Sequence, residues 1–146
     1  MSRHGYVDDC CDFEMNLYRG RVARTIKGRR GQSFLRELAA AMDSMPEKIL
    51  IAEELINSDG DCCAIGVVCK SRGLDVAGVD PQAPEQVAGI VDISETMARE
   101  IEFENDDGSY YDETPEQRWH RMRAWVQRHL ITDPHMGGLP DEVRKV

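Results

Sequence analysis

Apolar residues recur at intervals of three and four over much of this 146-residue chain, which is the spacing of one face of an α-helix. The pattern is clearest over residues 31–45, whose apolar stripe consists of Phe34, Leu35, Leu38, Ala41, Met42 and Met45. Arg36 and Glu37 fall outside the stripe, and Pro46 follows directly. We therefore predict a helix over 31–45 that packs one face against the core and ends before Pro46.

The last helix is predicted over residues 114–131, because its start carries three separate signals. Thr114 can cap the helix, Pro115 suits its first position, and Gln117 completes a capping box. Apolar residues then keep the helical spacing: Trp119, Met122, Trp125, Val126 and Leu130. An aromatic stripe at this spacing is usually buried, so we interpret both tryptophans as core residues.

Two shorter helices are predicted in the first half of the chain. Val22 and Ile26 lie four positions apart on one face of a helix over 15–28. Asp61 is suited to the N-cap of a helix over 62–71. A glycine follows or closes each of these segments and can end the helix.

Residues 84–104 predict two further helices, because Pro84 suits a first helical position and Ser94 suits an N-cap. The second of these helices is expected to end at residues 105–108. The pair resembles a helix-turn-helix pattern in which Asp92 replaces the usual turn glycine. Its second helix carries four glutamates against one arginine, which opposes binding to phosphates. We interpret the motif as packing geometry.

Residues 48–56 are ambiguous, since their β-branched residues favour a strand while the apolar spacing suits a helix. We expect a short strand or turn that runs into a helical piece. The predicted fold class is mainly α: a compact single-domain bundle of about five or six short helices over 15–131, with at most a small strand pair near 48–56. Residues 1–14 are expected to be a loosely ordered lead-in and residues 132–146 an irregular tail.

Composition excludes two classes of protein. The chain is 41% hydrophobic and 31% charged, which is too apolar for a disordered chain and too charged for a membrane protein. The first nine residues contain no apolar run of the kind that a secretory signal needs. We therefore expect a cytoplasmic protein without a membrane partner, whose five cysteines are reduced thiols and form no structural disulfide.

The formal net charge of −9 is unevenly distributed. Residues 1–48 hold nine Lys/Arg and seven Asp/Glu, a net of +2, and residues 114–146 hold six and four, again +2. Residues 49–113 hold three and sixteen, a net of −13. Such asymmetry can steer a charged partner. We predict a partner-binding acidic surface made of Glu95, Glu100, Glu102, Glu104, Asp106 and Asp107.

Positive charge is concentrated in the segment 19–30, which holds six cationic residues: Arg19, Arg21, Arg24, Lys27, Arg29 and Arg30. This segment is the candidate contact for nucleic acid or phosphate. Tyr18 is the only aromatic residue beside it, so a base-stacking platform is not indicated. The alternative is that the basic and acidic segments pack near each other and solvate one another, as charge runs usually form solvated faces.

Cysteine and histidine residues raise the question of a metal or catalytic site. Cys62, Cys63 and Cys69 lie close together in the sequence, and His120 and His129 share the last predicted helix. No C-x-x-C pair occurs, and the spacing of the histidines directs them to different faces, which does not match a zinc site. We assign no catalytic residue, no metal ligand and no cofactor, and we favour buried cysteines that pack as small apolar residues.

A resemblance to known proteins rests on five stretches: Arg19–Val22, Gly28–Leu35, Asp61–Val68, Glu104–Asp106 and Glu113–Trp119. On these residues the chain resembles, over about 19–130, a family of short uncharacterised proteins encoded by bacteria and their prophages. The family has no assigned activity, so the resemblance implies no catalytic residue. It implies a phage or prophage setting, where small acidic proteins often bind and block host machinery.

Three functional hypotheses follow. The first is a non-enzymatic protein-binding module, a phage- or prophage-encoded inhibitor of a host or defence complex that acts through its acidic surface. Its partner would be a host or phage protein, and homo-oligomers are left open. The alternative is a nucleic-acid-binding protein that uses residues 19–30. The second alternative is an enzyme or metal protein centred on cysteine and histidine.

Overall fold

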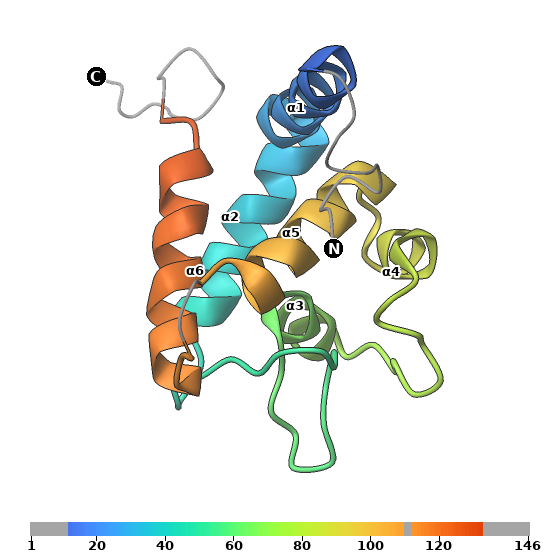
Figure 1. Cartoon of the computed structure of the whole chain (residues 1–146). Coiled ribbons are helices and arrows are strands. Elements are labelled where there is room, and N and C mark those ends of the chain that lie inside the picture. The colour runs from blue at the N-terminus through green and yellow to red at the C-terminus, as the bar shows by residue number, and fades with distance from the viewer. Residues whose placement is uncertain (1–11, 110–111, 133–146) are drawn as a thin grey trace, which may run out of the picture.

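The computed structural model describes residues 12–109 and 112–132, where it contains six helices and no strand (Figure 1). In chain order the helices are α1 (Asp12–Lys27), α2 (Arg29–Asp43), α3 (Ala64–Arg72), α4 (Pro84–Val91), α5 (Glu95–Asp107) and α6 (Pro115–His129). The mainly α fold predicted from the sequence is confirmed. Of the predicted lead-in over 1–14, residues 12–14 belong to α1, which begins three residues earlier than predicted, and the rest lies outside the described residues. The predicted tail over 132–146 lies outside them except for residue 132.

Helix α5 occupies the centre of the molecule. It packs against α1, α3, α4 and α6, while α2 packs against α1, α3 and α6 (Figure 1). The core between these helices is apolar, and its largest fully buried side chains are Leu35, Leu38, Met42, Leu50, Ile65, Met97, Ile101 and Met122. The predicted stripes of α2 and α6 both face this core, and both tryptophans of α6 are buried.

Helices α1 and α2 are separate because the chain bends at Gly28 and the two helix ends approach each other closely. A Cβ atom on Gly31 would collide with the carbonyl oxygen of Thr25. The buried Gln32 fixes the junction, since its Nε2 donates to the carbonyls of Ile26 and His129, both at 2.8 Å. Its Oε1 accepts from the backbone N–H of Ile131 at 2.9 Å. One side chain therefore joins the ends of α1 and α6 to the start of α2.

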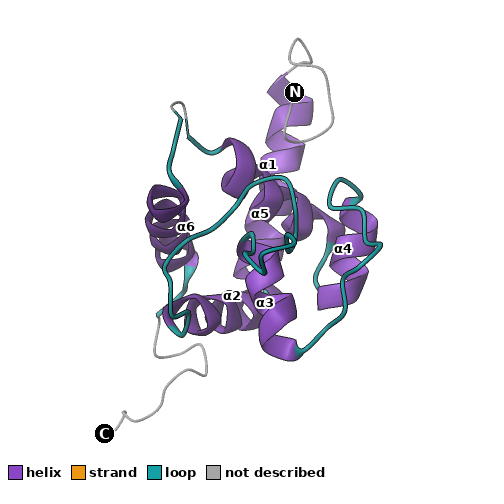
Figure 2. Cartoon of the chain, turned by 90° about the horizontal axis from the view of Figure 1, so that it is seen from below, coloured by secondary structure: helices purple, strands orange, loops and turns teal. Residues whose placement is uncertain are grey.

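The segment between α2 and α3 is a loop, which agrees with the expectation of at most a small strand pair near 48–56, and the helical piece expected there does not form. Only an isolated antiparallel bridge forms, between Ile56 and Cys62. The backbone groups of the loop form hydrogen bonds to separate parts of the chain. The Leu50 N–H donates to the Pro115 carbonyl, and the Ile51 N–H donates to the Cys62 carbonyl. The apolar residues Leu50 and Leu55 serve as buried anchors for the loop rather than as one face of a strand. Figure 2 shows this loop running past α3 and α5.

Asn105, near the end of α5, ties this loop to two helices. Its Oδ1 accepts from the first N–H of α3, that of Ala64, at 3.1 Å. Its Nδ2 donates to the Ile51 carbonyl at 2.9 Å. Its own carbonyl accepts from Arg118 at 2.9 Å and from Arg121 at 3.2 Å, both on α6. All these groups are satisfied, as buried polar groups require.

The same two arginines of α6 also bind a covered carboxylate. Arg121 donates two hydrogen bonds to Glu113, at 2.7 and 2.8 Å, and Arg118 lies 3.4 Å from it. The Glu113 side chain is only 7% exposed, and these arginines hold the pKa of its carboxyl below the usual value. The pair fixes the start of α6 together with the predicted capping box of Thr114 and Gln117, which is present.

Two predicted helix boundaries are wrong. Helix α5 continues through Asn105 to Asp107, because the Asn105 side chain bonds to the loop and to α3 and so does not compete with the backbone of its own helix. Helix α3 is capped by Cys63 rather than by Asp61, since the Cys63 sulfur accepts from the Gly66 N–H at 3.4 Å.

Two helical glycines provide a test of the loop's packing. A Cβ atom on Gly66 of α3 would collide with the carbonyl of Leu55, whereas one on Gly89 of α4 meets nothing. We expect Gly66→Ala to lower the free energy of unfolding by about 2 kcal/mol. Gly89→Ala should raise it by about 1 kcal/mol, the ordinary gain in helix propensity. Urea unfolding of both variants measures this, and equal effects would contradict the close approach of the loop.

Candidate binding surfaces

The predicted acidic surface on α5 is not continuous. Of its six carboxylates only Glu95 and Asp107 are exposed, and they stand at opposite ends of the helix, about 18 Å apart by its rise per residue. Glu102, Glu104 and Asp106 are partly covered. Sequence spacing indicated an exposed segment, but the packing of four helices around α5 covers most of it.

Glu100 lies inside the protein, with only 6% of its surface exposed. The hydroxyl of Tyr18 on α1 donates to its Oε1 at 3.3 Å. This carboxylate therefore joins α5 to α1 and does not belong to an exposed acidic surface. Nothing in its local sequence predicts the burial, since the Tyr18 side chain comes from 82 residues away.

Glu102 is a carboxyl group in an unfavourable place. Its Oε2 is covered and has no hydrogen-bond partner among the described residues. Burial, followed by repulsion from Asp106 and Asp80, raises the pKa of Glu102 to about 7. Arg99 opposes this shift only in part. Near neutral pH this side chain is therefore partly protonated and contributes less than one full negative charge.

The helix-turn-helix geometry is present but is built into the interior. Asp92 ends α4 in the left-handed conformation, with φ 61° and ψ 52°, and Ser94 caps α5 through the Met97 N–H. A helix that reads DNA must lie in the major groove. Helices α1, α3, α4 and α6 pack around α5, so α5 has no continuous face free to enter the major groove.

The predicted basic segment, in contrast, is on the surface. All six residues from Arg19 to Arg30 are exposed, four on α1 and two in the first turn of α2. Only Arg30 has an acidic neighbour among the described residues, Asp92 at 4.0 Å. We call these six residues the basic face. Helix α1 packs against α5, as the alternative of neighbouring basic and acidic segments expects, but Arg30 with Asp92 is the only ion pair of the basic face within the described residues.

Positive and negative charge lie at opposite ends of the molecule. Figure 1 places α1, with most of the basic face, at one end, and the loops that follow α2 and α3 at the other. Those loops carry exposed carboxylates on Glu53, Glu54, Asp59, Asp75 and Asp80. Separated charge of this kind orients a charged partner as it approaches.

A groove runs beside the basic face, between α1 and the end of α6. Its volume is about 430 Å³. Apolar side chains wall it, namely Val22, Ala23, Ile26, Leu130 and Ile131, and Tyr18 and Glu100 also border it. Three cations stand around it: Arg19 and Lys27 from α1 and Arg128 from α6. None of the three forms an ion pair within the described residues. Sequence reasoning missed Arg128, because only folding brings it beside α1.

Among the described residues, the cysteines and histidines do not form a reactive site. Burial raises the pKa of Cys63 to about 12 and that of Cys69 to about 11, and it also raises the pKa of Cys62. A nucleophilic or metal-binding cysteine needs the thiolate. Within the described residues no group of three or more His, Cys, Asp or Glu side chains is placed to hold a metal ion. His129 instead bonds to its own helix through the Trp125 carbonyl.

Comparison with known proteins found no matching family model, no matching curated protein and no matching solved structure. Across residues 12–109 and 112–132, none of the helices has both the length and the apolar character needed to cross a membrane. The function therefore has to be argued from the surfaces described above.

Glu102 generates a testable pH dependence. Its pKa is about 7 in the folded protein against 4.5 as the ordinary value, so the folded state binds more protons between these limits. Stability should therefore fall as the pH rises from about 4.5 to about 7, and then level off. Glu102→Gln should remove this fall and raise the free energy of unfolding at pH 8 by about 1 kcal/mol, allowing for solvent screening of a partly exposed group.

Urea unfolding at pH 5 and pH 8 measures both effects. Glu54→Gln, on the neighbouring loop, is the matched control for the loss of one carboxylate, and it should change stability by less than about 0.5 kcal/mol. A Glu102→Gln variant that is no more stable than the parent at pH 8 would contradict the burial of this carboxyl group.

Proposed function

We propose that this chain is a non-enzymatic protein-binding module whose partner docks on the basic face and in the groove beside it. The observation that carries the proposal is the combination of apolar walls with cations that form no ion pair among the described residues. In a chain of net charge −9, Arg19, Lys27 and Arg128 surround an apolar groove of about 430 Å³. The acidic surface expected on α5 is too discontinuous to serve as the docking site.

The apolar walls favour a protein partner over nucleic acid. Val22, Ala23 and Ile26 offer aliphatic contact area, which suits the apolar side chains of a peptide segment. Bases bind proteins largely by stacking on aromatic side chains. Of the aromatic rings that border the groove, Tyr18 is 4% exposed and hydrogen-bonded to Glu100, and His129 is held by the Trp125 carbonyl and packs against the Trp125 ring. The best-fitting partner segment carries apolar residues flanked by carboxylates.

Electrostatics supports the same partner chemistry. Like charges gathered on one face repel each other, and an acidic partner relieves that repulsion as it binds. Arginine is also enriched among the residues that dominate protein interfaces. The acidic loops at the far end repel the same partner, so it meets the basic end first.

The resemblance to phage and prophage proteins extends the proposal to its biological setting. In such a setting the partner is a host or defence protein, and this chain acts as an inhibitor by covering a surface that the partner needs. Support for the binding surface itself comes from the geometry of α1 and α6 and does not depend on that setting.

Site-specific crosslinking tests the docking surface. A photoreactive benzoylphenylalanine replaces Ala23 in the groove, or Gly89 on the exposed side of α4 as the matched control position. In bacterial lysate treated with nuclease, the groove position should crosslink one protein and the α4 position should not. Adding Lys27→Glu should reduce the crosslink about tenfold, because it reverses a charge at the rim.

Arg36→Glu makes the same charge change on an exposed part of α2 outside the groove and should leave the crosslink intact. Equal crosslinking at both positions, or an equal loss with both charge reversals, would contradict docking in the groove. A crosslinked product that forms in untreated lysate and disappears after nuclease treatment would instead support binding to nucleic acid.

Nucleic-acid binding remains the second candidate, favoured by the start of α2. Gly28 caps this helix without a side-chain hydrogen bond, and its first turn holds Arg29 and Arg30 and no acidic residue. The N-terminus of a helix attracts phosphate, and arginines in that turn add to the attraction. This end of α2 lies within the basic face.

Fluorescence anisotropy with labelled duplex and single-stranded DNA tests the second candidate. If all six cations contact phosphates, the logarithm of the association constant should fall against the logarithm of the salt concentration with a slope of about −5 for duplex. The triple change Arg24→Ala, Lys27→Ala and Arg29→Ala should roughly halve that slope, and Arg36→Ala should not alter it. At a low salt concentration of about 20 mM, charges are only weakly screened. Absence of binding under this condition would exclude nucleic-acid binding.

A further inference from the structure

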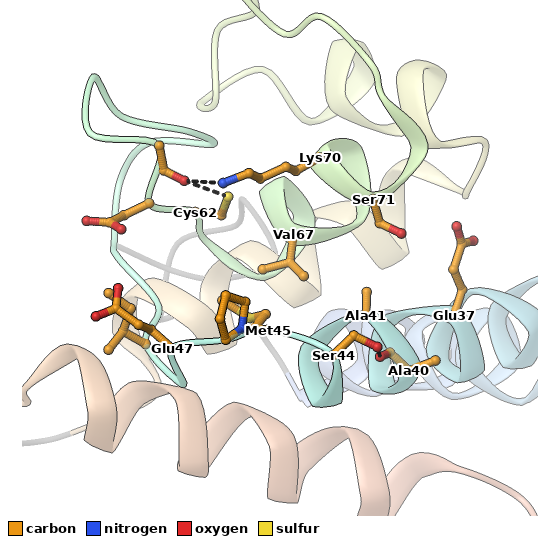
Figure 3. Close-up of a pocket in the computed structure, with 14 residues that line it drawn as sticks. Glu37, Ala40, Ala41, Ser44, Met45, Glu47, Cys62, Val67, Lys70 and Ser71 are labelled. Atoms are coloured by element: carbon orange, nitrogen blue, oxygen red, sulfur yellow. Dashed lines mark hydrogen bonds between the residues drawn. The ribbon is translucent and has the colours of Figure 1, made fainter.

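A second groove lies between α2 and α3 (Figure 3). Its volume is about 450 Å³, and it is separate from the groove beside the basic face. Small side chains line it from both helices, with Ala40, Ala41 and Ser44 on α2 and Ser71 on α3. Figure 3 shows Val67 directed into this space from α3. The floor of the groove is therefore aliphatic, and the chain's own side chains do not fill it.

Acidic side chains dominate the rim of this groove. Three carboxylates border it, on Glu37, Glu47 and Asp61, against the single cation Lys70. Glu37 is paired with Arg72 at 2.6 Å, whereas Glu47 and Asp61 form no ion pair within the described residues. Lys70 offsets one of these charges, and the lining stays negative. The groove therefore favours an apolar partner segment that carries positive charge.

A segment of this chemistry is exposed on α1 of the same chain. Among the described residues, Leu17 is the large apolar side chain with the greatest exposure, 52%. Arg21 and Arg24 follow it by four and seven positions, so the three side chains share one face of the helix. Both arginines are exposed and unpaired within the described residues. The side of α1 that borders the other groove carries Ala23 and Lys27 instead.

A glycine on the same face of α1 leaves room for close approach. Gly20 lies between Leu17 and Arg24 in the helical spacing. A Cβ atom on Gly20 would meet only the guanidinium group of Arg24, at 3.4 Å, so packing inside the chain does not require glycine there. Glycine within a helix lowers its stability. Contact with another backbone or side chain at close range is a use that only glycine permits.

The two surfaces lie at opposite ends of the molecule. Figure 1 places α1 at one end, and the loop after α2, which carries Glu47 and Asp61, at the other. Two basic ends repel each other, as do two acidic ends, so an approaching copy is oriented with α1 toward the groove. The net charge of −9 opposes association, but at physiological salt this repulsion is screened beyond about 8 Å.

We propose that the groove between α2 and α3 receives α1 of a second copy of this chain. Leu17 of one copy lies against the aliphatic floor of the next copy. The two exposed arginines on the same face of α1 pair with Glu47 and Asp61 on the rim. The contact joins two different surfaces, so it is heterologous and can add further copies head to tail. It does not use the groove between α1 and α6, so its failure would leave the proposed docking surface untouched.

Sedimentation velocity of the full chain over a range of concentrations measures this association. At low salt the sedimentation coefficient should rise with concentration, and added salt should reverse the rise, because ion pairs contribute to the contact. Leu17→Ser should raise the dissociation constant at least about tenfold, since it removes the leucine that the contact buries. Leu74→Ser, at the other exposed large apolar side chain, is the matched control and should leave the constant unchanged.

Mixing two variants tests the head-to-tail geometry. Ala40→Arg, at an exposed position of α2, should block the groove and leave α1 intact. Leu17→Ser and Ala40→Arg should each be monomeric where the parent associates, and an equal mixture should form a dimer that does not grow further. A variant that combines Arg21→Glu with Glu47→Arg should associate more tightly than either single variant, because the exchanged charges still attract each other.

A chain that stays monomeric at low salt over the whole concentration range would overturn the proposal. So would association that survives Leu17→Ser, or a mixture that stays monomeric although circular dichroism shows both variants folded. Loss of association in Lys27→Glu but not in Arg21→Glu would overturn it as well, since the contact would then lie in the groove beside α6.

Discussion

The buried amide of Asn105 is the interaction on which the arrangement of the other elements depends. It accepts from the first N–H of α3 and donates to the Ile51 carbonyl, while its own carbonyl receives two arginines of α6. An aspartate could not donate to Ile51 and would bury a charge, and a leucine would leave both backbone groups unsatisfied at a cost of about 1–3 kcal/mol each. Only a side chain with a donor and an acceptor fits.

These hydrogen bonds of Asn105 hold α5 at the centre of the molecule. The central position determines where the carboxylates of α5 can lie. Its carboxylates must then be covered or moved to the helix ends. Glu100 is held by Tyr18, and Glu102 is partly covered, with an Oε2 atom that has no hydrogen-bond partner among the described residues, and its raised pKa of about 7 leaves it partly protonated near neutral pH. The segment with the densest acid therefore presents little acidic surface, and the surface available for binding shifts to α1, the start of α2 and the end of α6.

Local signals in the sequence predicted most of the helices but not their surroundings. The Thr114 capping box and the stripe of α2 act within one or two turns, so they are readable, and the basic face is readable because α1 and the first turn of α2 carry it. The burial of Glu100 depends on Tyr18 and the extension of α5 on Ala64, and no periodicity encodes such distant partners. The groove beside the basic face was missed for the same reason, since Arg128 of α6 borders the same groove as α1 only in the folded chain.

The net charge of −13 over residues 49–113 thus misleads as a guide to the surface. Within the block, Glu113 is neutralised by Arg118 and Arg121, and Glu95 pairs with Arg99 at 3.2 Å. Arg72 of the block pairs instead with Glu37, which lies outside it. Several of the remaining exposed carboxylates lie on the loops that follow α2 and α3, far from α1 (Figure 1), while Asp92 lies beside Arg30. An approaching anion therefore meets a positive end whose field the distant loops weaken only slightly at physiological salt, where screening acts over about 8 Å. That is why a strongly acidic chain can still present a surface for acidic partners.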